Sequence, residues 1–440
     1  MRICLVSLQY GITATGGGGV HVNRIADEYI RRDHEVTVIT MHTSRTEADA
    51  SITEADGVRY SHDVNGDINV IRILVDEGLA TPYDGDTKEE EYSRLKRFAD
   101  FAEKLIIRDS ESYDIVHNHG HHILPGYLAY KLKDNPLKIV STIHFLESTL
   151  RGKEGVDHIN EMPEQLYGDL VSWEVMTSFA DEVVVISPGQ QEDFLKMLSG
   201  AETPARKENI DDRIHLISSG VEDGSILSAE EILDKWSDKE RKLNVLTYSR
   251  MDPSKGLHYA VRALPQLAAA YPPGVSMTAA GIPAKGYDKV LKDEKEKIGP
   301  DYDCKLAFFD RIATIDERNS FMDKFDIYMF PTLSEPFGIT LIETAARGML
   351  VLTTDSAGPY YILAHDGAEE KSWGYITPYG INVKLTDDPE DNLVNNLVEA
   401  WKWSCDNTDA VKEMILHFRE LILQKYTWSS VVSQYLEMYK

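Results

Sequence analysis

The sequence predicts an α/β fold made of two doubly wound domains, each built on a mainly parallel sheet. Short apolar runs alternate with longer amphipathic segments along the 440 residues. This alternation opens twice, once near residue 3 and again near residue 244. Hydrophobic residues make up 42% of the chain, which is enough to fill two cores.

The first half opens as strand, glycine-rich loop, helix and strand. Residues 3–7 form an apolar run, and Gly16–Gly19 follow as a predicted loop. Apolar residues at helical spacing predict a helix over 20–32, before a strand over 35–40. Further strands are predicted over 68–73, 114–117, 138–144 and 182–187, with a helix over 89–108. These elements predict a first domain over residues 1–215.

The second half repeats this pattern and predicts a domain over residues 216–424. Strands are predicted over 244–249, 275–280, 304–308, 327–331 and 350–354, and helices over 258–271 and 339–347. The polar stretch 199–212 is interpreted as a linker or exposed loop, and Trp428–Tyr439 as a final amphipathic helix. Doubly wound sheets bind ligands at the carboxyl ends of their strands. We therefore expect the two domains to face each other across a cleft.

Composition excludes several classes of protein. The net charge is −27; 18 basic and 32 acidic residues precede position 190, giving −14, and the remaining 28 and 41 give −13. An even acidity disfavours binding to nucleic acid or an anionic membrane, both of which attract basic surfaces. The three cysteines include no close pair, which argues against a disulfide scaffold and predicts a cytoplasmic protein.

The segment from Ser334 to Glu343 is the clearest candidate site. A strand ends before it, Glu335 lies in the loop, and a helix begins near Gly338. Helix N-termini present unpaired N–H groups that suit a phosphate, and glycine permits close approach of a ligand. A carboxylate accepts two hydrogen bonds at once, which suits ribose hydroxyls at Glu343 and sugar hydroxyls at Glu335. The alternative is a surface loop with two solvated glutamates.

A second candidate site follows the strand over 244–249 and contains Arg250 and Lys255. Two cations at a strand's carboxyl end can clamp a diphosphate and neutralise the charge that develops as it leaves. The alternative is a pair of solvated surface cations.

Glycines and histidines supply the remaining candidates. Gly16–Gly19 do not complete a dinucleotide-binding fingerprint, but they permit close approach of a ligand. His117 and His119 lie on one face of a strand, so a zinc site is a minor alternative, and His144 ends another strand. Two Asp-x-Asp segments, at 84–86 and 301–303, are interpreted as solvated turns because neither ends a strand.

Together these residues resemble the retaining glycosyltransferases of family 4, which have the GT-B fold. The resemblance rests on Glu335-Pro-Phe-Gly-Ile-Thr-Leu-Ile-Glu343, on Arg250 with Lys255-Gly256, and on Gly18-Gly19-Val20. Asp114-Ile-Val-His117, Thr142-Ile-His144 and the closing Tyr426-Thr-Trp428 also match. Phe145-Leu146-Glu147 is similar to the sucrose synthase and sucrose-phosphate synthase branch. In this family the last helix, here within residues 425–440, packs back on the first domain.

The resemblance implies a role for each matching position. Glu335 would bind the donor sugar, Glu343 the ribose, and Arg250 and Lys255 the diphosphate. His144 would lie beside the anomeric carbon. Backbone amides around Phe337, Gly338, Ile339 and Thr340 would assist, and Gly18 and Gly19 would face the donor phosphate or the acceptor. The family retains anomeric configuration and needs neither metal nor cofactor, and its leaving phosphate takes the acceptor's proton.

The expected reaction moves a hexose from a nucleotide sugar, UDP-glucose or a related UDP-sugar, to a hydroxyl of a small-molecule or carbohydrate acceptor. Two alternatives are a family-4 enzyme acting on lipid or polysaccharide at the membrane surface and a non-catalytic sugar-nucleotide-binding protein. A phosphorylated acceptor would meet basic residues of the first domain, for which Arg94, Lys96, Arg97, Arg151 and Lys153 are candidates. The sequence leaves homo-oligomer formation open.

Overall fold

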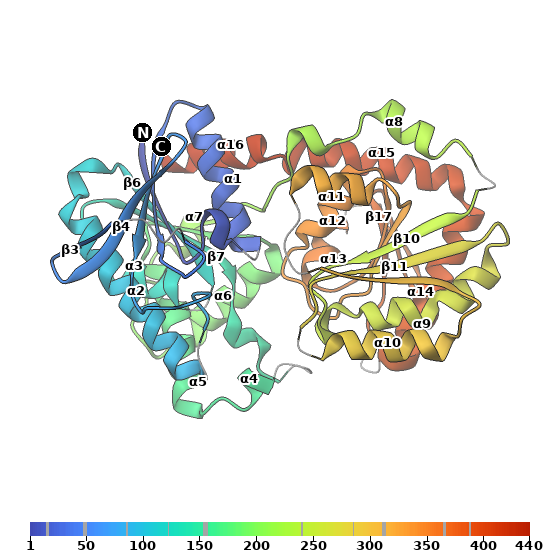
Figure 1. The fold of residues 1–440 in the computed structure, drawn as a ribbon, viewed down its shortest axis with the longest axis horizontal. Coiled ribbons are helices and arrows are strands. Elements are labelled where there is room, and N and C mark those ends of the chain that lie inside the picture. Colours follow the sequence, from blue (N-terminus) through green and yellow to red (C-terminus); the bar gives the residue numbers. More distant parts are fainter. Residues whose placement is uncertain are drawn as a thin grey trace. The chain divides into compact units, whose positions relative to one another are not determined.

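The computed structural model describes residues 1–14, 17–46, 51–84, 87–121, 123–152, 157–238, 241–284, 286–309, 314–363, 367–386 and 389–440. The chain divides into two compact units (Figure 1). Unit 1 comprises Met1–Ser218 together with Val431–Lys440, and unit 2 comprises Ser219–Ser430.

Unit 1 is a nine-stranded sheet with the order β3-β4-β5-β2-β1-β6-β7-β8-β9. Strands from β5 to β9 in this order pair in parallel, whereas β3 and β4 form an antiparallel edge. The strands are β1 (Arg2–Ser7), β2 (Glu35–Met41), β3 (Ile52–Ala55), β4 (Val58–Asn65), β5 (Ile68–Ile73), β6 (Ile115–His121), β7 (Lys138–Phe145), β8 (Glu182–Val185) and β9 (Ile214–Leu216). The helices are α1 (Gly17–Arg31), α2 (Lys88–Arg108), α3 (Leu124–Leu132), α4 (Asp157–Asn160), α5 (Glu164–Val175), α6 (Pro188–Gly200) and α7 (Ile210–Arg213).

Two predictions for unit 1 need correction. The described part of the predicted glycine loop is helical, because α1 begins at Gly17. A Cβ on Gly19 would lie 2.9 Å from that of Ala14, so the first helical turn packs too closely for a side chain there. The stretch 199–212, predicted as a linker, contains the end of α6 and all of α7 except its last residue, and β9 begins directly after α7. The antiparallel pair β3–β4 was not predicted, since most of its side chains are exposed.

Unit 2 is an eight-stranded sheet with the order β12-β11-β10-β13-β14-β17-β16-β15. It is parallel from β12 to β17, and β15–β17 form an antiparallel edge. The strands are β10 (Leu243–Tyr248), β11 (Val275–Gly281), β12 (Asp303–Phe308), β13 (Ile327–Phe330), β14 (Leu350–Thr354), β15 (Glu369–Lys371), β16 (Gly374–Thr377) and β17 (Gly380–Val383). The helices are α8 (Ala229–Lys235), α9 (Leu257–Ala270), α10 (Tyr287–Ile298), α11 (Ile315–Met322), α12 (Ile339–Ala346), α13 (Ala357–Leu363), α14 (Pro389–Asp406) and α15 (Thr408–Lys425).

The last helix, α16, spans Trp428–Tyr439, as the sequence predicted, and its residues from Val431 onward belong to unit 1. Lys138 Nζ donates to the carbonyl of Met438 at 2.8 Å, and Tyr435 is fully buried. Both chain ends therefore lie in unit 1, where they are marked in Figure 1.

Candidate functional site

The predicted donor-site loops of unit 2 follow two neighbouring parallel strands, β10 and β13. They are joined by hydrogen bonds to the carbonyl of Ser254, which accepts from Leu333 N at 2.7 Å and from Thr332 Oγ1 at 3.2 Å. Gly256 has φ +66°, and a Cβ there would lie 2.0 Å from the carbonyl oxygen of Pro331. Only glycine allows the two loops to approach this closely.

Lys255 and Glu335 meet across these loops. Lys255 Nζ lies 3.1 Å from Glu335 Oε2 and donates to the carbonyl of Ser334 at 2.8 Å. Their side chains are 12% and 19% exposed, so the pair is mostly shielded from water but can still be reached by a ligand. The site thus holds a compact cation beside a carboxylate that can accept hydrogen bonds from hydroxyls.

Arg250 is in the same loop as Lys255 but pairs with a different carboxylate. Its Nε donates to Asp252 Oδ2 at 2.7 Å, and its side chain is 73% exposed. Burial disfavours the charged form of Asp252, but Arg250 and the Ser254 hydroxyl outweigh it and lower the pKa of Asp252. The two predicted phosphate-binding cations therefore lie in one loop, and each is paired with its own carboxylate.

The N-terminus of α12 lies directly after Glu335. Gly338 caps the helix with φ +104°, and Phe337 N donates to Glu335 Oε1 at 3.3 Å. Phe337 is buried, and Thr340 Oγ1 lies 2.8 Å from the hydroxyl of Tyr328. The N–H groups of a first helical turn lack intrahelical partners, so Gly338, Ile339 and Thr340 form an edge suited to an anion.

Glu343 lies one turn further along α12 and is bound by a residue that the sequence did not indicate. Arg318 Nη1 of α11 lies 2.8 Å from Glu343 Oε1. Burial and the charge of Glu343 raise the pKa of the nearby Tyr248. No local pattern signals Arg318, because the pair forms only when α11 and α12 pack on the same sheet.

In unit 1, the predicted residues Gly18 and His144 lie side by side. A Cβ on Gly18 would stand 3.5 Å from His144 Cδ2, so the first turn of α1 lies against the imidazole. His144 is near the end of β7 and is 9% exposed. Burial lowers the pKa of His144 to about 4, so its ring is neutral at physiological pH.

His144 belongs to a cluster of four histidines and two tyrosines, of which the sequence indicated only the histidines of β6 and β7. His21 of α1 contributes a third element, and Tyr435 and Tyr439 come from α16. The ring contacts and hydrogen bonds join His21–Tyr435, His117–Tyr439, His117–His119, His119–His144 and His21–His144. Burial lowers the pKa of all four histidines, and repulsion between neighbours adds to this at all but His144.

Within the described residues, no three His, Cys, Asp or Glu side chains gather as ligands for a metal ion. His122 and the side chain of His121 lie outside these residues, as do Gly85, Asp86 and Gly16. Asp84 accepts hydrogen bonds from Thr81, and Asp303 pairs with Lys242 at 2.6 Å. Asp84 and Asp303, one from each Asp-x-Asp segment, thus have protein partners.

The described cations that were considered for a phosphorylated acceptor already have protein partners. Four of the five are described, and each is engaged by a carboxylate or an aromatic ring; Lys153 lies outside the described residues. The pairs are Arg94–Asp76, Arg97–Asp76, Arg151–Glu164 and Lys96–Trp173.

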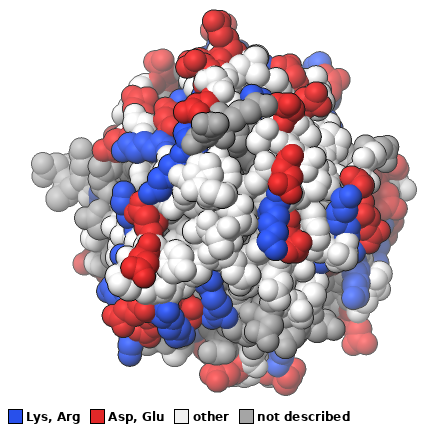
Figure 2. Space-filling view, turned by 90° about the vertical axis from the view of Figure 1, so that its right-hand side faces the viewer, with Lys and Arg blue, Asp and Glu red and all other residues white. Residues whose placement is uncertain are grey.

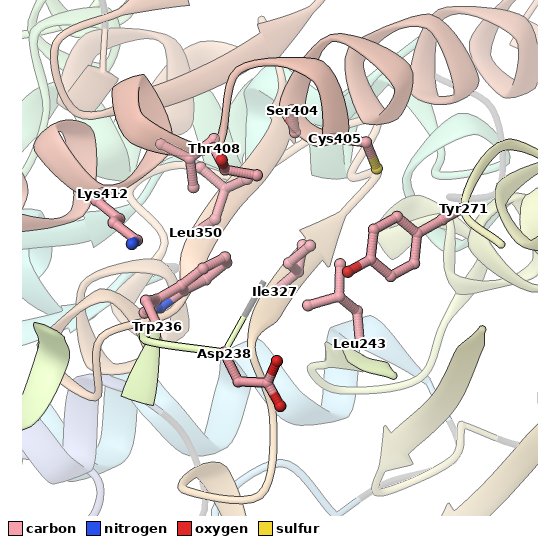
Figure 3. Close-up of a pocket in the computed structure, with 11 residues that line it drawn as sticks. Trp236, Asp238, Leu243, Tyr271, Ile327, Leu350, Ser404, Cys405, Thr408 and Lys412 are labelled. Atoms are coloured by element: carbon pink, nitrogen blue, oxygen red, sulfur yellow. The ribbon is translucent and has the colours of Figure 1, made fainter. Parts of the chain in front are cut away.

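An apolar pocket of unit 2 lies at the amino ends of the strands, at the opposite edge of the sheet from the loops that carry Lys255 and Glu335. Leu243, Ile327 and Leu350, the first residues of β10, β13 and β14, line it with Tyr271 and the α14–α15 junction (Figure 3). Its volume of about 30 Å³ is far too small for a sugar nucleotide.

Basic and acidic side chains are mixed on the face of the molecule that Figure 2 shows. On the face in Figure 2, Lys and Arg lie beside Asp and Glu, and the described residues form no extended basic patch. Across the described part of the chain, no helix combines the length and apolar character needed to span a bilayer.

Three comparisons place this geometry among known proteins. A model of the family described as Family 4 Glycosyltransferase in conflict systems matches residues 84–435. The uncharacterized glycosyltransferase MJ1607 of Methanocaldococcus jannaschii is 22% identical, covering 100% of this chain and 98% of that protein. The alpha-maltose-1-phosphate synthase of Mycolicibacterium smegmatis is 22% identical, covering 100% and 99%. The structure of sucrose-phosphate synthase from Thermosynechococcus elongatus superimposes with a TM-score of 0.70 at 16% identity, covering 100% and 98%, and has the same GT-B fold.

Proposed function

Because the chain belongs to the family of family-4 glycosyltransferases in conflict systems, we propose that it moves a hexose from a UDP-sugar to a hydroxyl acceptor with retention of anomeric configuration. UDP-glucose or a close relative is the proposed donor. The acceptor is a carbohydrate or another small molecule. The alpha-maltose-1-phosphate and sucrose-phosphate synthases, by their names, make glycosides of this general kind.

The observation that carries the proposal is the contact between Lys255 and Glu335 beside the N-terminus of α12. Lys255, with Arg250, supplies positive charge for the diphosphate. The unpaired N–H groups of the helix add to this electrostatic stabilisation. Glu335 accepts hydrogen bonds from sugar hydroxyls, and Glu343, held by Arg318, accepts them from the ribose.

The reaction exchanges one C–O bond for another. The bond between the anomeric carbon and the diphosphate breaks, and its electron pair leaves with the phosphate oxygen. The acceptor oxygen bonds to the same face of the sugar, and its proton passes to the leaving phosphate. Charge on the leaving group is stabilised by Lys255, Arg250 and α12, so we propose that the reaction needs no metal ion.

An uncharged acceptor is favoured by the ion pairs of unit 1. Arg94, Arg97 and Arg151 are each already paired with a carboxylate. A phosphorylated acceptor would have to displace these partners. The net charge of −27 further favours a dissolved acceptor over one in an anionic membrane, and the free thiols of Cys4, Cys304 and Cys405 suit the cytoplasm.

The test compares Lys255→Ala and Glu335→Gln with Lys242→Ala, which removes an ion pair elsewhere in unit 2. Turnover of a donor panel is read by mass spectrometry, and folding by circular dichroism. We expect kcat/KM to fall roughly 10²–10³-fold in the first two variants, the usual effect of removing one group that stabilises developing charge. The control should keep its rate. Wild-type turnover by Lys255→Ala would refute the assignment. Tight sedimentation with anionic vesicles at moderate salt would refute the dissolved acceptor.

A further inference from the structure

A continuous series of side-chain contacts in unit 1 runs from the last helix to His144. Tyr439 OH lies 2.5 Å from His117 Nδ1, and His117 Nε2 lies 2.7 Å from Thr142 Oγ1. The ring of His117 packs on that of His119, with centroids 3.9 Å apart. His119 Nδ1 then lies 3.3 Å from His144 Nε2.

The hydrogen-bond partners of His119 indicate which of its nitrogens carries the proton. A neutral imidazole has one N–H and one accepting nitrogen. His119 is fully buried, and within the described part of the chain its Nε2 has no hydrogen-bond partner. Among backbone groups, a buried N–H without an acceptor is rarer than a buried carbonyl without a donor, and the same desolvation cost applies to a ring N–H. The proton of His119 therefore belongs on Nδ1, which donates it to His144 Nε2.

The same reasoning assigns the proton of His144. Its Nε2 accepts this hydrogen bond, so the single proton of the neutral ring lies on Nδ1. Among the described residues no group hydrogen-bonds to His144 Nδ1, and this atom is not one of the enclosed polar atoms. Nδ1 is therefore the ring atom left for a ligand.

We infer that His119 is a positioning residue that holds His144 in the Nδ1–H tautomer, so that His144 donates a hydrogen bond to an oxygen atom of the sugar nucleotide. This rests on the proposed function and on the family resemblance, which implies that His144 lies beside the anomeric carbon of the donor sugar. A ring protonated at Nδ1 and bonded at Nε2 has no free lone pair. His144 then cannot remove the acceptor's proton, which agrees with its transfer to the leaving phosphate.

Packing contacts alone do not determine which tautomer His144 adopts. Gly18 lies against the His144 ring, and His21 meets it edge-on with centroids 4.9 Å apart. These contacts fix where the ring lies but are the same for either tautomer. The hydrogen bond from His119 is the contact that distinguishes the two.

The tautomer can be read directly from the ring nitrogens by NMR. The full-length protein is labelled with ¹⁵N-histidine, and the His144 signal among the 14 histidines is assigned by its loss in His144→Asn. In the wild type we expect His144 to carry its proton on Nδ1. A wild-type spectrum with the proton on Nε2 overturns the inference without any further variant.

Two substitutions test the role of His119. His119→Asn places an amide N–H near the position of Nδ1 and should keep both the tautomer and the rate. His119→Phe removes the donor, so we expect the Nε2–H form to appear and kcat to fall about 10-fold with little change in KM for the donor, the order expected for one hydrogen bond. Unchanged tautomer and kcat in His119→Phe would overturn the inference.

His117→Gln is the matched control, because His117 is equally buried but bonds to Thr142 and Tyr439. It should leave His144 protonated on Nδ1. An equal change of tautomer in this control would show a general packing effect and overturn the assignment to His119. If the wild type has the expected tautomer but turns over no sugar nucleotide, the tautomer assignment is supported and the proposed function is refuted.

Discussion

Acidification should destabilise unit 1 through its buried histidines, and His144 allows the size of the effect to be worked out. In the unfolded chain a histidine has a pKa of about 6.5. Burial lowers the pKa of His144 to about 4. Between these values the unfolded chain binds more protons than the folded one, so stability falls as the pH falls from 6.5 through 4. From pH 7 to pH 5 the linkage relation gives a loss of about 2 kcal/mol from His144 alone.

Other groups titrate in the same unit, so the measurement must be a difference. His21, His117 and His119 act in the same direction, because burial lowers their pKa values too. Glu174 acts in the opposite direction, because burial raises its pKa to about 8 and the folded state gains protons on acidification. Comparing wild type with His144→Asn largely cancels these shared contributions and any loss of stability that does not depend on pH.

Hydrogen exchange of peptides from β6 and β7, followed across a urea series, reports the free energy of unfolding of unit 1 itself. This is needed because a protein with two units need not unfold in one step. Between pH 7 and pH 5 the wild type should lose about 2 kcal/mol more than His144→Asn. Equal losses would mean that His144 keeps an ordinary histidine pKa in the folded state. Burial in the histidine cluster would then not disfavour its protonation.

Three further outcomes are expected. Gly256→Ala should lower the stability of unit 2 by more than about 3 kcal/mol, since its Cβ would collide with Pro331, whereas Gly286→Ala, which has open space at φ +85°, should cost about 1 kcal/mol in urea unfolding. Equal losses would refute the expectation that a Cβ at Gly256 collides with the carbonyl oxygen of Pro331. Tyr439→Phe should cost roughly 1–3 kcal/mol by hydrogen exchange in unit 1, because His117 loses one of its two partners and Tyr29 loses its hydrogen bond to the same hydroxyl. An unchanged stability would contradict these bonds. Sugar transfer should persist after EDTA treatment and dialysis, and loss of activity restored by added Mg²⁺ would refute metal independence.

Much of the fold was predictable because it depends on local patterns. The apolar run of β1 and the helical spacing of α16 lie within a few residues of one another, so their periods could be read directly. The edge strands β3, β4 and β15 were not predicted because they are mostly exposed and lack that apolar signal, and β3 and β15 are also short. The glycine run was misassigned because close packing against Ala14, rather than loop formation, accounts for Gly19.

Some residues of the candidate site could likewise be predicted from local sequence, and others could not. Glu335 and Lys255 are 80 residues apart and stand out because each lies in a recognisable strand-to-helix segment. Arg318 lies in an ordinary amphipathic stretch, and only its ion pair with Glu343 identifies it. His21 and Tyr435 are 414 residues apart, and nothing local relates them.

The sequence by itself determined the fold class, the family resemblance and the types of residue available for chemistry. Hydrophobic burial follows from composition and period, which are properties of the sequence alone. Only the tertiary structure decided which atoms meet: that Lys255 touches Glu335, that Arg318 binds Glu343, and that His119 bonds to His144. Hydrogen bonds and ion pairs depend on distance and direction, and these are set when segments far apart in the chain pack together.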